Sequence, residues 1–376
     1  MQSLLLDTVI LLFSFYALAR VVEPFFIESL EIISKRLKLS ADVAGATFMA
    51  MGSSAPEFFV SLFAVFRISA GEQAVGAGTI VGSAIFNILV IVGASALFKR
   101  AVLTWQPVIR DLSFYIFTIL LLLVTFLDGE ITLAESTLFV GLYIIYIFSF
   151  KIWKRLFPYK TQGDIDSEII AVTEKEELEI KLRPATVKNL LDKAISLLFV
   201  DLKAHPRLYF VNFLTAIAAL AIFSHIMVES AVGVAHTFGV PEVIIALTIL
   251  AAGTSIPDLI SSIVVAKRGR GDMAVANAVG SNVFDINIGL GLPWIIFILW
   301  KGSSVPVVTE NLTSSIFLLF ATVIALLFLL IAKKWELGRY AGVLLIAMYG
   351  FYLLTQSGII KITLCLNIAG VHCAML

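Results

Sequence analysis

Two short polar stretches interrupt apolar segments and carry the same chemistry in both halves of the chain. They are Gly52–Glu57, with the sequence GSSAPE, and Gly253–Asp258, with the sequence GTSIPD. In each, hydroxyl side chains precede a proline and a carboxylate at identical spacing. Proline has no N–H and clashes with the carbonyl four residues before it, so Pro56 and Pro257 predict a kink in each helix. A break at membrane depth is tolerated where it is buried in protein or lines a cavity, and its freed carbonyls are then available to bind cations.

A second pair of motifs supplies further oxygen atoms. Gly82–Ile88 reads GSAIFNI and Gly280–Ile286 reads GSNVFDI. Residues four apart share a helix face. Two polar stripes result, Ser83 with Asn87 and Ser281 with Asp285, and both can face the proline breaks. The alternative for the serine and glycine positions is close helix packing through small residues, which does not account for the charge of Asp285.

The available ligands are all oxygen atoms from carboxylates, hydroxyls, an amide and backbone carbonyls. Hard oxygen ligands suit calcium, sodium and potassium, whereas soft metals prefer thiolate or imidazole. Glu57 and Asp258 would neutralise the two charges of a calcium ion. The alternative is a packing kink in which Glu57 reaches toward the membrane surface. Because the break and the acid recur together, the pattern favours the cation site.

The composition sets the class of protein. Hydrophobic residues make up 60% of the 376-residue chain and charged residues 14%, and the mean hydropathy is +1.00. Soluble proteins have an apolar share nearer half, so we predict an all-α polytopic membrane protein. The formal net charge is zero, so nothing indicates a nucleic-acid partner, and the lipid bilayer is the expected surroundings. Apolar runs of about 20 residues predict ten transmembrane helices, near residues 3–33, 40–67, 74–98, 105–127, 132–155, 207–236, 240–267, 272–300, 312–332 and 338–360.

A hydrophilic segment separates these helices into two groups of five. We expect a first transmembrane repeat over residues 1–156, a cytoplasmic loop over 157–206 and a second repeat over 207–376. Because five is odd, the two repeats must be inverted relative to each other, with helices 2 and 7 broken. Inverted repeats with interrupted helices place ion sites near the bilayer midplane. The first helix is expected to be tilted, or broken near Pro24.

Basic residues in the loops set the orientation. Those on one side are Lys35, Arg36, Lys38, Lys99, Arg100, Lys151, Lys154, Arg155, Lys267, Arg268, Arg270, Lys333, Lys334 and Arg339, and those on the other are Arg67, Lys301 and Lys361. By the positive-inside rule the richer side is cytoplasmic, which puts both termini outside.

At these motifs the chain resembles the cation/calcium exchanger superfamily, and within it the potassium-dependent sodium/calcium exchangers. The resemblance covers both halves outside the central loop. It is carried by Asp42–Glu57, Leu250–Ser255, Gly271–Val275 and Gly280–Ile286, followed by Gly289–Gly291 and Pro293–Trp294. Asn287 departs from the pattern, since relatives usually have an apolar residue or threonine there. The resemblance implies a secondary active antiporter of the plasma membrane that moves calcium, sodium and potassium, with no catalytic residue and no cofactor.

The resemblance also implies the ligands of each ion. Positions matching Glu57, Asp258, Ser53 and Thr254 bind calcium. Sodium sites draw on Ala50, Ser54, Glu57, Ser83 and Asn87 in the first half and on Ala251, Ser255, Asp258, Ser281 and Asp285 in the second. Potassium would bind at Asp285 with Glu57 and Asp258. Sodium and calcium would compete for one cluster, and alternating access would follow from the first and sixth helices sliding past the core.

Other functions stay open at this point. One is a potassium-independent sodium/calcium exchanger or a proton/calcium exchanger of the same fold, since some potassium-independent relatives also have an acid at the position of Asp285. Another is a cation channel without exchange. An intramembrane aspartyl protease is suggested by Gly269–Asp272, which reads GRGD, but this aspartate falls in a loop among cytoplasmic arginines.

The central loop and the C-terminal region carry further patterns. Residues 164–179 are acidic but lack the glycine and terminal acid of an EF-hand loop, so we expect a solvated linker. Val187–Leu202 is typical of an amphipathic helix on the inner membrane surface. His225 and Glu229, one helical turn apart, could relay protons or form an ordinary hydrogen-bonded pair. Cys365 and Cys373 could form a disulfide outside the cell or stay unpaired.

Overall fold

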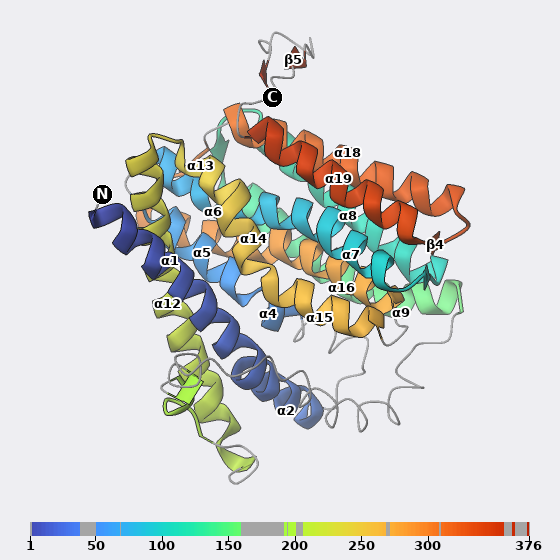
Figure 1. Ribbon diagram of the computed structural model, residues 1–376, viewed down its shortest axis with the longest axis horizontal. Helices are drawn as coiled ribbons and strands as arrows, with labels where there is room; N and C mark the ends of the chain where they lie inside the picture. Colours follow the sequence, from blue (N-terminus) through green and yellow to red (C-terminus); the bar gives the residue numbers. More distant parts are fainter. Residues whose placement is uncertain are drawn as a thin grey trace.

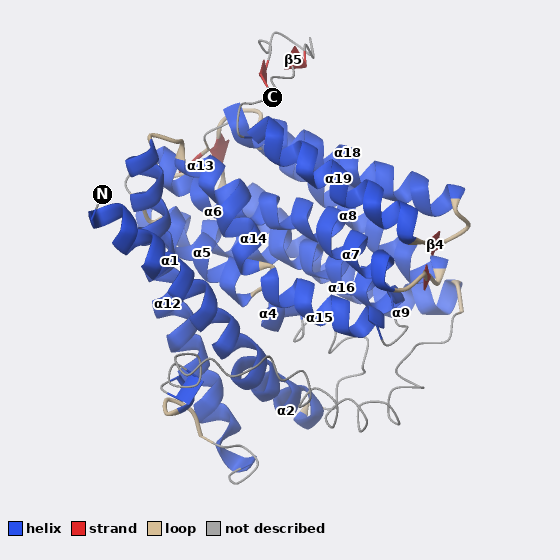
Figure 2. Ribbon diagram, in the orientation of Figure 1, coloured by secondary structure: helices blue, strands red, loops and turns tan. Residues whose placement is uncertain are grey.

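The computed structural model describes residues 2–37, 50–67, 69–158, 192–193, 195–200, 206–267, 271–307, 310–356, 363–364 and 374–375. These residues are almost entirely helical, and the strands among them are two-residue pairs (Figure 1, Figure 2). Among the described residues, seven helices are long and apolar enough to cross a membrane, namely Leu4–Leu30, Gly71–Phe98, Trp105–Thr125, Leu133–Leu156, Tyr209–Phe238, Met273–Lys301 and Leu312–Ala332. The prediction of a helical, multi-pass membrane protein is confirmed.

The helices fall into two groups, one before and one after the central segment. The first half contains α1 (Gln2–Val21), η1 (Val22–Ile27), α2 (Glu28–Arg36), α4 (Ala50–Ser53), α5 (Ala55–Val65), α6 (Ala70–Phe86), η3 (Asn87–Ile91), α7 (Val92–Phe98), α8 (Trp105–Thr125) and α9 (Leu133–Leu156). The second contains η5 (Pro206–Leu208), α12 (Tyr209–Phe238), α13 (Glu242–Ile245), η6 (Ala246–Leu250), α14 (Ala251–Thr254), α15 (Ile256–Lys267), α16 (Gly271–Phe284), η7 (Asp285–Leu290), α17 (Gly291–Lys301), α18 (Glu310–Ala332) and α19 (Arg339–Gln356).

Several helices widen locally into π-helical turns, which are η1, η3, η6 and η7. The first of these encloses Pro24, so the first helix passes the proline in a widened turn and continues into α2. The turns η3 and η7 begin at Asn87 and Asp285, the matching polar positions of the two stripes. Single π-helical turns inside α-helices occur often at functional sites.

The apolar core is divided into two clusters. The larger one is built from α6 to α9 and α16 to α19. The smaller one joins α1 and α12 to one face of α5. These two helices pack side by side and run at an angle to the rest of the bundle (Figure 1). The smaller cluster also includes Val75 of α6, Ile245 of α13 and Ala246 and Leu250 of η6, so the α1–α12 pair packs onto the rest of the bundle through this cluster.

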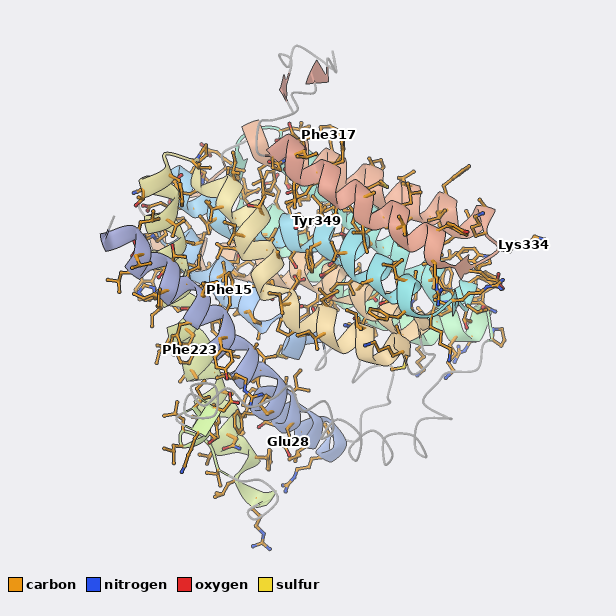
Figure 3. The ribbon with its side chains drawn as sticks, in the orientation of Figure 1. Phe15, Glu28, Phe223, Phe317, Lys334 and Tyr349 are labelled. Atoms are coloured by element: carbon orange, nitrogen blue, oxygen red, sulfur yellow. The ribbon has the colours of Figure 1, made fainter. Side chains whose placement is uncertain are left out.

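Two glycines allow close helix approach next to the motifs. A Cβ added at Gly82 of α6 would lie 2.3 Å from the carbonyl oxygen of Leu247 in η6. A Cβ at Gly253 of α14 would lie 2.2 Å from the ring of Phe15, which Figure 3 labels on α1. At Gly82 the neighbour is backbone, so glycine is required for the observed packing, whereas at Gly253 a side chain would force the Phe15 ring to move.

Short antiparallel strand pairs tie the loops together. The strand β1 (Ala101–Val102), between α7 and α8, pairs with β4 (Glu336–Leu337), between α18 and α19. The strand β2 (Glu130–Ile131), between α8 and α9, pairs with β3 (Val305–Pro306), between α17 and α18. Each pair joins a loop of one half to a loop of the other.

Part of the central segment is anchored on the α1–α12 pair. The ring of Phe199 stacks on Phe25 with the centroids 3.9 Å apart. The Asn212 side chain accepts from the Val200 N–H at 2.8 Å and donates to its carbonyl at 2.7 Å. Asp192 of the same stretch forms an ion pair with Arg20 of α1 at 2.8 Å. Residues 187–191, 194 and 201–202 of the predicted amphipathic stretch, residues 164–179 and both cysteines lie outside the described residues.

Candidate cation site

The first polar hexapeptide interrupts a helix at Ser54. Helix α4 ends at Ser53 and α5 begins at Ala55, with Ser54 between them at φ −89° and ψ 6°. The Ser54 N–H still donates to the Ala50 carbonyl at 3.0 Å. Pro56 lies in the first turn of α5, where its missing N–H leaves the Gly52 carbonyl without its usual helical donor. The helical hydrogen-bond ladder is thus broken at this point.

The second hexapeptide repeats this geometry. Helix α14 ends at Thr254 and α15 begins at Ile256, and Ser255 between them has φ −88° and ψ 0°. The Ser255 N–H donates to the Ala251 carbonyl at 3.3 Å, and its own carbonyl accepts from Leu259 N–H at 3.0 Å. Two segments far apart in sequence therefore adopt the same interrupted helix.

The two breaks meet through their side chains. Helix α5 packs against α6 and η7, and α15 packs against α16 and η3. The hydroxyl oxygens of Ser83 and Ser255 are 2.8 Å apart. The Glu57 carboxyl group lies against the hydroxyls of Thr254 and Ser255 and within electrostatic range of Asp258. Polar groups from both halves thus converge on one place.

Three carboxylates share this interior. Glu57, Asp258 and Asp285 have 2%, 7% and 1% of their surface exposed. Asp285 lies within electrostatic range of both other acids. Burying charges together is unfavourable unless a counter-charge compensates them. A bound cation would supply that compensation.

Several unpartnered oxygen atoms lie on the predicted ligand residues, and others, such as Ser95 Oγ and Ser224 Oγ, lie on residues that are not predicted ligands. Among the described residues, the buried atoms without a hydrogen-bond partner include Ser54 Oγ, Glu57 Oε2, Asn87 Oδ1 and Asp285 Oδ1. A buried acceptor without a partner costs about 1–3 kcal/mol. Four such oxygens on predicted ligand residues indicate that a ligand or water completes the site.

The other predicted ligands are partly engaged with the backbone. Ser53 is half-buried and donates to the Ala50 carbonyl at 3.4 Å. The Thr254 hydroxyl donates to the Leu250 and Ala251 carbonyls at 3.1 and 3.3 Å. Ser281 Oγ donates to the Ala278 carbonyl at 3.3 Å. A hydroxyl that donates its one hydrogen keeps two lone pairs on its oxygen, so these side chains can still bind a cation. Ser281 Oγ also accepts from the Asn87 amide nitrogen at 3.5 Å, which leaves it one lone pair.

No three acidic, histidine or cysteine side chains of the described chain converge closely enough to hold a metal by themselves. A cation at this place would therefore depend on hydroxyl, amide and carbonyl oxygens as well as on the acids. Calcium suits such a mixed set, because it takes about six to eight oxygen ligands in flexible geometry.

Sequence reasoning missed a polar layer next to the site. Asn282 bonds Asn87 and the Tyr115 hydroxyl, at 2.8 and 3.0 Å. Asn287 donates to the Thr118 hydroxyl at 2.9 Å, from the side of η7 that faces α8. Asn282 follows Ser281 in the second motif, where the first motif has Ala84 after Ser83, and this polar difference could have identified it. Tyr115 and Thr118 carry no local signal, since only the fold brings α8 here.

The suggested pair of His225 and Glu229 has different partners. Glu229 forms an ion pair with Arg67, and the His225 ring packs against Phe63 with centroids 5.2 Å apart. Arg67 also pairs with Glu72 at 3.4 Å. These residues join α12 to the end of α5 and the start of α6.

Comparison with known proteins identifies similar chains over most of the length. The chain matches the family model described as "Sodium/calcium exchanger protein" over residues 7–151 and 208–358. It is 29% identical to sodium/potassium/calcium exchanger 2 of Gallus gallus, with 94% of this chain and 77% of the relative covered. It is 31% identical to sodium/potassium/calcium exchanger 4 of Homo sapiens, with 91% and 79% covered.

Solved structures share the fold. The sodium-calcium exchanger NCX_Mj, soaked with Na⁺ and Sr²⁺, superposes with a TM-score of 0.56 at 21% identity, covering 94% of this chain and 99% of that one. The H⁺/Ca²⁺ exchanger CAX gives a TM-score of 0.65 at 17% identity, covering 94% and 81%. At these identities the likeness concerns the fold alone.

Proposed function

The chain belongs to the sodium/calcium exchanger protein family, and from that premise we propose that it is a secondary active antiporter exchanging sodium for calcium with potassium cotransport. Its relatives are exchangers, so it is a transporter and the protease interpretation of Gly269–Asp272 is dropped. The observation that carries the proposal is the meeting of Glu57 with the second break, at Thr254 and Ser255, inside a buried cluster of acids.

The acidic residues on the two interrupted helices are the proposed calcium ligands. In this proposal Glu57 and Asp258 bind calcium, with oxygens at Ser53 and Thr254. The ligands for sodium are at Ala50, Ser54, Glu57, Ser83, Asn87, Ala251, Ser255, Asp258, Ser281 and Asp285. The short distance between the Ser83 and Ser255 hydroxyls and the unpartnered oxygens of Ser54 and Asn87 support this set. Shared acids make sodium and calcium compete.

Potassium binding is assigned to Asp285 together with Glu57 and Asp258. Asp285 adds a third buried negative charge to a site where two acids already match the charge of calcium. The two relatives described above, at 29% and 31% identity, are named sodium/potassium/calcium exchangers, which supports the same assignment.

The proposed architecture has ten transmembrane helices in two inverted five-helix repeats, over residues 1–156 and 207–376, with a cytoplasmic loop between them. The strand pairs support it. In an internal repeat, the loop that carries β1 is equivalent to the loop that carries β3, and the loop with β2 is equivalent to the loop with β4. The β1–β4 pair is then the symmetry equivalent of the β2–β3 pair, and both pairs are present. The packing of α5 on η7 and of α15 on η3 has the same symmetry.

Alternating access is proposed to come from movement of the α1–α12 pair against the remaining helices. The extensive packing of α1 against α12 supports movement of these two helices as one unit, which would slide at the smaller apolar cluster that they share with α5 and η6. We place the protein in the plasma membrane. Both termini then lie outside the cell and the basic loops lie in the cytoplasm.

The test is calcium uptake by liposomes that contain the purified full chain. Sodium-loaded vesicles are diluted into sodium-free medium with radioactive calcium and potassium. We expect uptake that disappears when sodium is equal on both sides. A proton gradient of equal size should give none.

The alternatives give different results in the same vesicles. Uptake driven by a proton gradient without sodium would identify a proton/calcium exchanger. Uptake without any opposing gradient would identify a channel. Either result overturns sodium/calcium exchange as the function.

A further inference from the structure

A chain of buried polar side chains links the two halves beside the candidate site. The amide nitrogen of Asn87 donates to Asn282 Oδ1 at 2.8 Å and to Ser281 Oγ at 3.5 Å. The amide nitrogen of Asn282 donates in turn to the Ala84 carbonyl at 3.1 Å and to the Tyr115 hydroxyl at 3.0 Å. Asn282 and Tyr115 are fully buried. All hydrogens on both amide nitrogens are therefore used within the protein.

The chain permits one orientation of its two amides. An asparagine oxygen only accepts and its nitrogen only donates, although the two ends have nearly the same shape. The Ala84 carbonyl only accepts, so the nitrogen of Asn282 must face it. The oxygen of Asn282 then faces Asn87, so Asn87 must donate to it with its amide nitrogen. The Tyr115 hydroxyl can donate or accept, so it does not fix the orientation of the Asn282 amide. The Ala84 carbonyl fixes it.

The consequence falls on the other end of the Asn87 side chain. Its oxygen points away from Asn282 and is buried without a hydrogen-bond partner. We propose that Asn282 is a positioning residue that makes Asn87 present its oxygen, and not its N–H groups, to a sodium ion. This inference rests on the proposed function, in which Asn87 is a sodium ligand. A reversed amide would direct partial positive charge at the cation.

The internal repeat accounts for why only one half needs this device. Asn282 matches Ala84 in the other motif, and Asn87 matches Asp285. A carboxylate presents an acceptor at both oxygens, so Asp285 binds a cation in either orientation. An amide does not. The half with the amide at the ligand position is therefore the one that receives an orienting partner from the opposite half.

The experiment is a double-mutant cycle on the full chain in liposomes. The variants are Asn282→Ala, Asn87→Asp and their combination, and the measurement is the sodium concentration for half-maximal exchange. In the Asn87 background, we expect Asn282→Ala to raise that concentration about tenfold, because the orientation of the ligand is no longer fixed. In the Asn87→Asp background, the same change should leave it unchanged or lower it, since a carboxylate needs no orientation.

Two further variants separate orientation from packing. Asn282→Asp retains an acceptor toward Asn87 and, when protonated, a donor toward Ala84, so it should stay within about threefold of wild type. Tyr115→Phe leaves the deciding carbonyl in place and should have a similarly small effect. If Asn282→Ala does not fold, the nearly isosteric Asn282→Leu, which also lacks the acceptor toward Asn87, replaces it in the cycle. A tenfold loss of sodium affinity in the Asn87 background alone supports the proposal, and an equal change in both backgrounds contradicts it.

The outcomes are distinguishable from failure of the proposed function. If wild type shows no sodium-dependent calcium flux, the function is wrong and the orientation proposal falls with it. Suppose wild type exchanges, but Asn282→Ala raises the sodium concentration for half-maximal exchange equally in both backgrounds or in neither. The function then stands and the orienting role is overturned. Stabilisation of the purified protein by sodium, measured as a shift of its melting temperature, provides the same comparison without transport.

Discussion

Asp285 is the residue whose charge distinguishes the second polar stripe from the first, where Asn87 stands at the matching position. Replacing it by asparagine keeps an oxygen of the same reach and removes one negative charge. For Asp285→Asn we expect sodium/calcium exchange to continue while its dependence on external potassium is lost. The measurement is calcium uptake into sodium-loaded vesicles, with external potassium present or replaced by an inert cation.

A buried serine outside the site provides the control for this variant. Ser95 on α7 is fully buried, so Ser95→Ala should leave both exchange and potassium dependence as in wild type. Should Asp285→Asn behave like wild type with and without potassium, potassium cotransport would have to be abandoned while sodium/calcium exchange could stand.

Single residues were predictable where local chemistry repeats. The sequence pointed to Glu57 and Asp258 because each follows a proline break, and these side chains lie in the same buried cluster. The role of Tyr115 was not predictable, since its contact with Asn282 joins residues on α8 and α16. Glu229 was predicted to bond His225 one turn away, but Arg67, which follows α5, is its partner. Local spacing does not reveal such long-range contacts.

At the scale of helices, the interruptions were predictable and the π-helical turns were not. Proline at 56 and 257 fixes where each ladder is broken, because it lacks the donor for a specific carbonyl. The turn η6 has no proline or glycine among Ala246–Leu250, so its sequence resembles any buried α-helix. The turn packs closely against α6, a contact that its own sequence does not reveal.

The contact between α6 and η6 yields a stability prediction. Because a Cβ at Gly82 would lie 2.3 Å from a backbone carbonyl, Gly82→Ala should destabilise the protein by about 2 kcal/mol or more and lower its melting temperature in detergent. Gly350 on α19 is the matched control, since its added Cβ meets no atom within 4 Å. Gly350→Ala should leave the melting temperature unchanged or raise it, because alanine favours the helix. Equal effects of the two substitutions would contradict the close approach.

At the scale of the whole molecule, the fold separates a helix pair from a larger bundle. The pair α1–α12 contributes most of the smaller apolar cluster, which it shares with α5 and η6. Arg67 adds ion pairs from Glu229 of α12 to Glu72 of α6. Hydropathy predicted which segments are apolar enough to cross the membrane. It could not predict this division, because all membrane helices are apolar and only their contacts assign them to one cluster or the other.

Calcium binding to the purified protein in detergent tests the central claim most directly, namely that Glu57 and Asp258 together hold one calcium ion between the two interrupted helices. The account predicts about one bound calcium per wild-type chain, displaced by sodium, and none in Glu57→Gln or Asp258→Asn when both variants elute as folded protein. Unchanged calcium binding in both variants would contradict it.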